Sequence, residues 1–455
     1  MRIKFGACLL LFFAGLAAWA EEPAVALQST PEETTPHLSA DAPSLVTQSD
    51  PDYKNVLFGS AMFGASFDTA GYSDANGATS SNIMYFVQPS IAFRQTVPTA
   101  NWTLSYTPGV SISQHATDTT LFTHNLAGDG VWKATPRLTL HLRQDYSIST
   151  NPFETVGRVA LLPDLGGYFG PNYDGVIPSS KRTAYVTNAD ISYRMTAHTS
   201  IGITGGYQQF DYASTSNSLS SSALVNSTVF NGSVFVSDQI SKRQTIGVQL
   251  AYTDIYSYGS QQSRVQAPAA FLFDTVRLTQ HSLLTAFAGP EYSRSSMVTP
   301  ITVLDPITLA NVTVDLAISQ RAWHPAAGVT YAWSGTQDAF TLDFSRRISP
   351  GGGLMSANVM TFGSAAFRTR LSKRWSTEER LSVDNQDEIA LLGPNASFRT
   401  LSAGGSLTRE FNRNFSIRLD SAYISQTGNG LGFVPGNHGL VQITVDLHFL
   451  KGLGR

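Results

Sequence analysis

Apolar and polar residues alternate one by one along most of the chain, from about Lys54 to Phe449. In the stretch 138–148 every even position except Gln144 is apolar, and every odd position is polar. The same pattern recurs in 102–112 and 415–423. A period of two places the two sets on opposite faces of a β-strand. The pattern predicts an all-β protein whose strands each have one apolar face and one polar face.

The predicted strands are long, and their connections are alternately short and long. Most strands reach the ~10 residues that cross a bilayer at a tilt. Short turns are expected near Pro98, Thr135–Pro136, Ala197–His198, Ser241–Lys242, Thr279–Gln280, Gly335–Thr336, Ser372–Lys373 and Asn412–Arg413. Long connections are expected at 68–81, 151–180, 213–226, 258–265, 296–318, 386–396 and 426–437. This asymmetry is typical of outer-membrane barrels.

The fold predicted from these elements is a single antiparallel transmembrane β-barrel covering 54–449. It has about 18 strands, with 16 as the alternative, because strand boundaries carry an error of a few residues. Short turns would lie on the periplasmic side and long loops on the extracellular side, and an even strand number places both termini in the periplasm.

The ends of the chain do not follow the strand pattern. Residues 1–20 have a basic start, an apolar core and Ala18-Trp19-Ala20, which predicts a signal peptide cleaved after Ala20. The apolar core is too short to favour a retained membrane anchor. Residues 21–53 are rich in Pro, Glu, Thr and Ser and are expected to form a disordered periplasmic leader, while 450–455 are expected to be a periplasmic tail.

Composition narrows the class further. Charged residues are 14% of the chain, against roughly 25% in soluble proteins. The single cysteine, Cys8, lies in the signal, so the mature chain has no thiol for a disulfide, a metal site or catalysis. The formal net charge is −3, and removal of Arg2 and Lys4 with the signal makes it −5, which argues against a nucleic-acid partner.

The polar faces of the predicted strands define the candidate lining of the barrel. The lumen-lining candidates are Arg94, Arg143, Asp145, Asp190, Arg194, Arg347, Arg368, Arg370, Glu378, Arg380, Arg418 and Asp420. The arginines could attract anionic solutes. The favoured alternative is that they pair across strands with Glu378, Asp384 and Asp420. Arg399 and Arg409 share a face with leucines and are expected at the two rims, facing lipid.

The longest predicted loop, 151–180, mixes apolar residues with glycine and proline. It either folds inward as a constriction or covers the outer mouth, and the sequence favours neither.

No motif for catalysis, metal binding or cofactor binding emerges. The histidines are scattered, and there is no GxSxG, phosphate loop or dinucleotide fingerprint. The prediction is that the chain is not an enzyme and uses no cofactor or metal.

The last predicted strand has Val441, Ile443, Val445, Leu447 and Phe449 on one face. With the preceding Gly439, it resembles the C-terminal assembly signal of outer-membrane proteins. The candidate signal residues are Gly439, Val445, Leu447 and Phe449. The resemblance implies the barrel-assembly machinery as a partner. Those proteins usually end at the aromatic residue, whereas this chain continues to Arg455.

The region 54–455 also resembles the uncharacterised outer-membrane β-barrel porin families of Gram-negative bacteria. The segments that carry this resemblance are "LSYTPGVSI" (104–112), "HPAAGVTYAW" (324–333), "SRRISPGGGL" (345–354), "RTRLSKRW" (368–375) and the ending "HFLKGLGR". Some members lie beside exopolysaccharide export genes, so the resemblance makes polysaccharide a candidate partner. It carries over no functional residues.

Two functions from different classes follow. The first is a porin-like channel in the bacterial outer membrane for passive passage of hydrophilic solutes or an exported polysaccharide. The second is a non-conducting scaffold whose long loops bind a polysaccharide or an envelope partner. Either form would contact outer-membrane lipid and lipopolysaccharide.

Overall fold

The computed structural model describes residues 55–73, 79–114, 120–149, 180–214, 225–258, 262–304, 311–350, 355, 357–389, 397–412, 414–429 and 436–452. The predicted signal, the predicted leader and nearly all of the predicted loop 151–180 lie outside these residues. Among the described residues, no helix is long and apolar enough to cross a membrane.

Eighteen strands form one antiparallel sheet in the order of the sequence. They are β1 (Asn55–Ser73), β2 (Thr79–Val97), β3 (Ala100–Ser113), β4 (Thr120–Lys133), β5 (Leu138–Ser149), β6 (Ser180–Arg194), β7 (Thr199–Ser214), β8 (Asn226–Ser241), β9 (Gln244–Tyr258), β10 (Gln262–Thr279), β11 (Ser282–Leu304), β12 (Asn311–Ser334), β13 (Asp338–Pro350), β14 (Ala357–Ser372), β15 (Trp375–Glu388), β16 (Ser397–Asn412), β17 (Phe415–Asn429) and β18 (Gly436–Gly452).

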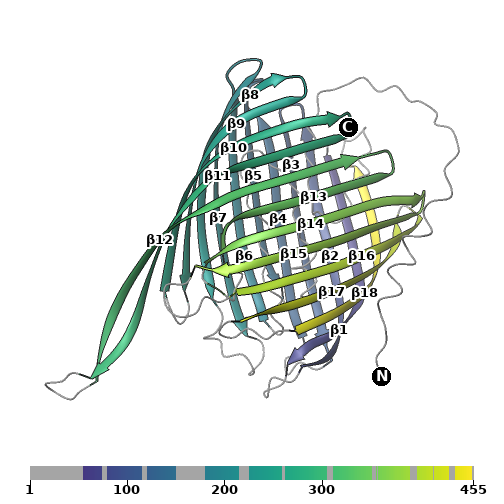
Figure 1. The fold of residues 1–455 in the computed structure, drawn as a ribbon. Helices are drawn as coiled ribbons and strands as arrows, with labels where there is room; N and C mark the ends of the chain where they lie inside the picture. The colour runs from purple at the N-terminus through teal and green to yellow at the C-terminus, as the bar shows by residue number, and fades with distance from the viewer. Residues whose placement is uncertain are drawn as a thin grey trace, which may run out of the picture. The chain divides into compact units, whose positions relative to one another are not determined.

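The sheet closes on itself because β1 pairs with both β2 and β18. Figure 1 shows the resulting barrel wall. Closure gives the first and last strands the hydrogen-bond partners that an open sheet would leave free. The predicted all-β antiparallel barrel of about 18 strands is therefore confirmed.

The final strand is longer than predicted. The sequence predicts a tail from residue 450, but β18 continues to Gly452. Leu450, Lys451 and Gly452 pair with the first residues of β1, the last pair being Val56 with Gly452. Because β1 begins at Asn55, its first residues would have no hydrogen-bond partners in β18 if that strand ended at Phe449.

The predicted long loop 296–318 is wrong over most of its length. There β11 and β12 form a continuous hairpin that remains paired up to Leu304 and Asn311. The many serines and threonines suggest a loop, but Val298, Ile301 and Val303 are β-branched residues that favour a strand.

The β11–β12 hairpin extends beyond both of its neighbours. On one side β10 pairs with β11 only as far as Val298, and on the other β13 pairs with β12 only over Ala327–Ser334. Figure 1 shows the hairpin projecting from the wall at the lower left.

Six of the short turns contain the same side-chain-to-backbone hydrogen bond. A serine, threonine or asparagine side chain at the end of one strand accepts a hydrogen bond from a backbone N–H two residues later. This contact is made by Thr135, Thr196, Ser241, Thr279, Ser372 and Asn412. It explains why a serine, threonine or asparagine stands at each of these turns.

The two faces of the wall differ as the alternation predicts. Large apolar side chains such as Leu142, Leu250 and Leu272 are exposed on the outer face. The residues next to them in sequence point inward and include most of the charged side chains of the strands. The outer face is therefore suited to lipid.

On the inner face, phenylalanine rings cover glycines of neighbouring strands. An added Cβ at each of these glycines would overlap the ring opposite it. The four pairs are Phe86 with Gly64, Phe235 with Gly202, Phe273 with Gly247, and Phe287 with Gly328. A ring over a glycine fixes strand register and restores the packing that the glycine lacks.

Substituting Gly247→Ala should therefore destabilise the barrel by about 1–3 kcal/mol, because the Phe273 ring must move. Urea unfolding, followed by the gel migration of folded and unfolded protein, measures the change. Gly205→Ala on β7 is the control, since a Cβ there meets no atom closer than 3.9 Å. Equal losses in the two variants would contradict this account.

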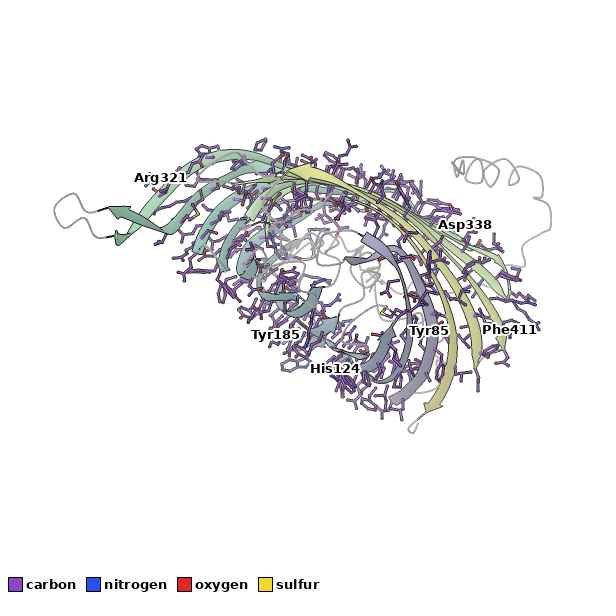
Figure 2. All side chains as sticks on the ribbon, turned by 90° about the horizontal axis from the view of Figure 1, so that it is seen from below. Tyr85, His124, Tyr185, Arg321, Asp338 and Phe411 are labelled. Carbon is purple, nitrogen blue, oxygen red and sulfur yellow. The ribbon has the colours of Figure 1, made fainter. Side chains whose placement is uncertain are left out.

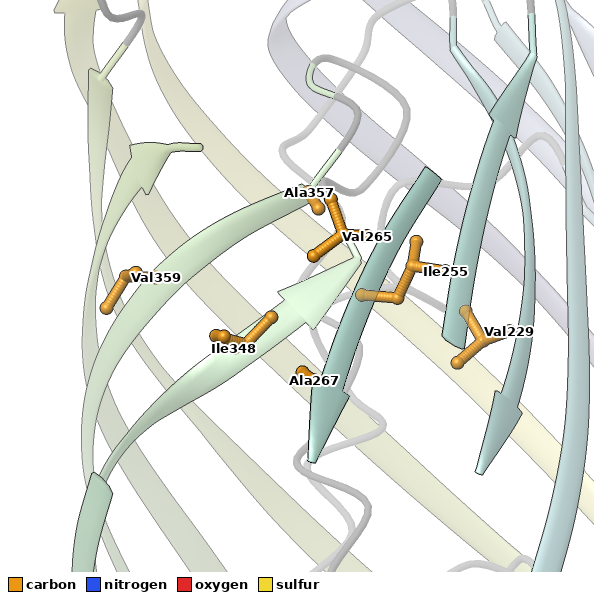
Figure 3. Close-up of a cluster of buried hydrophobic side chains, with 7 residues drawn as sticks. All are labelled: Val229, Ile255, Val265, Ala267, Ile348, Ala357 and Val359. Carbon is orange, nitrogen blue, oxygen red and sulfur yellow. The ribbon is translucent and has the colours of Figure 1, made fainter. Parts of the chain in front are cut away.

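Part of the wall has two layers. A hydrophobic cluster joins the ends of β13 and β14 that are farther from the short turns to strands β8–β10. Its members are Ile348, Ala357 and Val359 on the first side, and Val229, Ile255, Val265 and Ala267 on the second. Figure 3 shows the two groups of side chains facing each other. Ile348 and the exposed Phe344 are both at even positions of β13, so both side chains point outward. On β9, Ile255 is at an odd position and the exposed Leu250 is at an even one, so Ile255 points inward. The outward side of the β13–β14 hairpin thus packs on the inward side of β8–β10.

A buried polar contact supports this packing. The backbone N–H of Ile348 donates to Glu291 Oε2 on β11 at 2.9 Å, and Glu291 is buried. The contact connects β13 to the inner face of β11, beyond the point where β13 stops pairing with β12.

Candidate functional site

One charged region of the inner face lies on β4, β5 and β6. His141 is hydrogen-bonded to two carboxylates, with Nε2 at 2.9 Å from Asp129 Oδ2 and Nδ1 at 3.1 Å from Asp190 Oδ2. On the same strand, Arg143 Nε donates to Asp145 Oδ2 at 2.8 Å. We call Asp129, His141, Arg143, Asp145 and Asp190 the acidic wall, because its three carboxylates outnumber its two basic side chains, Arg143 and His141.

Asp129 is a member that the sequence analysis missed. It stands between Gly128 and Gly130, and these glycines weaken the alternation of β4. In the β4–β5 register Asp129 lies directly opposite Arg143, so the pairing of the two strands places it on the inner face.

A second charged region lies on β14, β15 and β17. Arg380 Nε donates to Glu378 Oε1 at 2.6 Å, and Arg418 Nε donates to Asp420 Oδ1 at 2.7 Å. Glu378 and Asp420 are both opposite Ser406 of β16, so the two ion pairs lie on either side of that one strand. Further along the wall, Arg368 lies opposite Glu378, and Arg370 lies opposite Ser376.

We call Arg368, Arg370, Glu378, Arg380, Arg418 and Asp420 the basic wall, because it has four guanidiniums and two carboxylates. Arg368 and Arg370 are exposed, and within the described part of the chain neither guanidinium has an ionic or hydrogen-bonded partner.

The predicted pairing of arginines with acids is correct in kind and wrong in geometry. Both hydrogen-bonded ion pairs of the basic wall join residues two positions apart on one strand, rather than residues on different strands. Neighbours two positions apart share a face of a strand, so a long arginine side chain reaches back to its own strand. Asp384 pairs with no arginine in this region; it is buried and accepts from Gln386 Nε2 at 3.0 Å.

The two walls oppose each other across the barrel. In the ring of eighteen strands, eight strands lie between β5 and β14 in either direction. Figure 2, which looks into the ring, shows Tyr185 of β6 and Asp338 of β13 on opposite sides. Both walls lie two to seven residues from the short turns, and therefore at similar depth, about 5–18 Å at roughly 2.5 Å of height per residue of a tilted strand.

The other lining candidates are more scattered. Arg94 is on the inner face of β2 opposite Thr103, Arg194 is exposed at the end of β6, and Arg347 on β13 lies near the buried Glu291. On the outer face, the Arg409 guanidinium lies 5.1 Å from the ring centre of Trp375 and 4.6 Å from that of Phe411. Arg399 is exposed on the same face of β16.

The half of the inner face farther from the short turns is different. It carries large apolar side chains that are almost completely buried, nine to fourteen residues from the turns. They are Met84, Phe86, Phe210, Ile255, Met360, Phe362, Phe398 and Ile424. At this level the inner face is apolar and closely packed, whereas at the level of the two walls it is charged.

The candidate assembly signal lies on β18. Val445 and Leu447 are on the outer face with the exposed Ile443, and the Gly439 N–H donates to Thr69 Oγ1 at 2.8 Å. The backbone of Phe449 pairs with Gly59. A role of these residues in assembly stays a prediction.

Comparison with known proteins finds likeness in fold only. The chain matches no protein-family model and no curated protein. The ferric-catecholate import receptor Fiu from E. coli K12 in its open form is 11% identical, with 87% of this chain and 81% of the receptor covered and a TM-score of 0.47. OccK2 (OpdF) from Pseudomonas aeruginosa is 9% identical, with 88% and 98% covered and a TM-score of 0.42. OccAB2 from Acinetobacter baumannii is 9% identical, with 87% and 98% covered and a TM-score of 0.42.

Proposed function

We propose that this chain is a porin-like channel of the bacterial outer membrane. Hydrophilic solutes, or an exported polysaccharide, would cross it passively between the acidic and basic walls. The observation that carries the proposal is the pair of oppositely charged walls at one depth of a barrel with an apolar outer face. Such a field orients zwitterionic and anionic solutes, and guanidiniums recognise carboxylate and sulfate or phosphate groups by their planar donors.

The remaining parts of the proposal follow from membrane insertion. The signal is removed after Ala20, both termini lie in the periplasm, and the barrel-assembly machinery inserts the chain. The channel needs no cofactor and catalyses no reaction.

A liposome-swelling assay tests solute passage. Proteoliposomes with the purified full chain should swell in isotonic monosaccharides and small amino acids, and should swell more slowly as solute size increases. Size dependence is expected because large apolar side chains such as Phe86 and Phe362 are buried on the inner face and leave less room for a solute. Swelling no faster than that of protein-free liposomes would contradict the channel.

A second candidate is a non-conducting scaffold whose long loops bind a polysaccharide or an envelope partner. The buried apolar side chains of the inner face favour it, because complete burial of Phe362 and Met360 requires that they be packed over rather than facing water. A scaffold would show neither swelling nor conductance and would purify with its partner.

A further inference from the structure

Two arginines face each other on the outside of the barrel. Arg294 of β11 and Arg321 of β12 are directly opposite in the antiparallel register, and both are exposed. Arg294 is an even number of residues from the exposed Val298 on β11, and Arg321 is two residues from the exposed Trp323 on β12. Both arginines therefore lie on the outer face. Figure 2 marks Arg321 on the part of β12 that leaves the ring.

The register brings two like charges into close contact. Side chains directly opposite in an antiparallel pair have Cβ atoms about 4.5–5.5 Å apart, and like charges there are destabilising. Within the described part of the chain, neither guanidinium has an ionic or hydrogen-bonded partner. The polar neighbour on β10 is Gln266, which lies opposite Arg294 and carries no charge. An anion between the two guanidiniums would remove the repulsion.

A third arginine extends the basic surface. Arg264 lies on β10 on the same face, two residues from Gln266. It already has a carboxylate partner, donating to Asp254 Oδ1 at 2.9 Å and Oδ2 at 2.6 Å, and it lies over the Tyr256 ring. The uncompensated charge is therefore concentrated at Arg294 and Arg321.

The height of the pair places it at the lipid headgroups. Arg294 is twelve residues from the start of β11 at Ser282. At roughly 2.5 Å of height per residue of a tilted strand this is about 30 Å, just above an apolar band of about 25 Å.

The outer-face residues below the pair agree with this height. They are Leu284, Ala286, Ala288, Pro290 and Tyr292 on β11, and Pro325, Ala327, Val329, Tyr331 and Trp333 on β12. Directly below the pair, Trp323 is 70% exposed and its ring centre lies 5.0 Å from that of Tyr292. An aromatic pair under a charged pair is the order expected at a membrane interface.

We propose that Arg294 and Arg321 bind a phosphate group of a phosphorylated glycolipid in the outer leaflet, the lipid A part of lipopolysaccharide. Two guanidiniums can donate several charge-assisted hydrogen bonds to one phosphate. The sugar would lie over Trp323 and Tyr292, and the acyl chains would continue down the apolar outer face. The site lies on the outside of the wall, so it is independent of solute passage.

Native mass spectrometry of the full chain in detergent, titrated with bisphosphorylated lipid A, tests this site. The wild type should bind lipid A, and Arg294→Gln/Arg321→Gln should bind it at least tenfold more weakly. The control Arg374→Gln/Arg409→Gln also removes two arginines, but near the short turns, and should bind like the wild type. Undiminished binding by the Arg294/Arg321 variant would overturn the proposal.

Two further measurements separate the alternatives. Dephosphorylated lipid A should bind at least tenfold more weakly than the phosphorylated form, and equal binding would overturn the role of phosphate. Inorganic phosphate at millimolar concentration should not displace the lipid, and complete displacement would show a free-anion site instead.

A merely structural role is excluded by unfolding without lipid. Because the variant Arg294→Gln/Arg321→Gln removes a repulsion, its midpoint in urea should equal or exceed that of the wild type. A lower midpoint would show that the arginines support the fold rather than bind a ligand.

Discussion

Replacing Ile255 with alanine is expected to destabilise the barrel by about 2–5 kcal/mol, the range for truncating a fully buried isoleucine. Ile255 is 0% exposed and lies between Val229 and Val265, facing the end of the β13–β14 hairpin. The truncation leaves a cavity between the two layers and loosens the inner one. Urea unfolding measures the loss, and single-channel recording should show larger or noisier conductance steps.

The control for this variant is Val248→Ala on the same strand. Val248 is 51% exposed on the outer face, so its truncation should cost well under 1 kcal/mol. If Ile255→Ala were as stable as Val248→Ala and conducted like the wild type, the two-layer packing would be wrong.

Reversing two charges of the basic wall should change ion selectivity most. The variant Arg368→Glu/Arg370→Glu changes the lining by four charges at exposed positions without an ionic partner in the described wall. At about 10 Å in water each charge changes an ion's energy by about 0.4 kcal/mol. Four charges shift the energies of an anion and of a cation by about 1.7 kcal/mol each, in opposite directions. The anion-to-cation permeability ratio should therefore fall by about a hundredfold at low salt, and by roughly tenfold at about 0.1 M salt, where the Debye length is about 10 Å.

Reversal potentials across a salt gradient measure this ratio. The control Arg399→Gln/Arg409→Gln removes charge from the outer face, where it cannot act on ions inside the barrel, and should leave the ratio unchanged. A wild-type ratio in the Arg368→Glu/Arg370→Glu variant would mean that ions do not pass the basic wall.

The strand alternation was sufficient to predict the fold because each strand has an apolar face on the outside of the barrel and a mostly polar face on the inside. A register of period two then fixes which residues face each way, as for Leu142 and Arg143. The turn positions were predictable for a similar local reason, because Thr135 and Thr196 bind the backbone of their own turns.

The parts that escaped prediction depend on contacts between distant strands. Nothing local in Ile348 or Ile255 indicates that β13 passes inside β8–β10, since both read as ordinary members of alternating strands. The contacts of His141 with two carboxylates likewise depend on Asp129 and Asp190, which come from the two neighbouring strands. The pairing of Arg294 with Arg321 follows only from the register of a hairpin that the sequence analysis took for a loop.

Single-channel recording of the purified full chain in planar bilayers tests the channel most directly. The account predicts discrete, ohmic conductance steps whose size rises with salt concentration, and a reversal potential that shifts when Arg368 and Arg370 are changed. A chain that inserts as a folded barrel and never conducts at any voltage would contradict it.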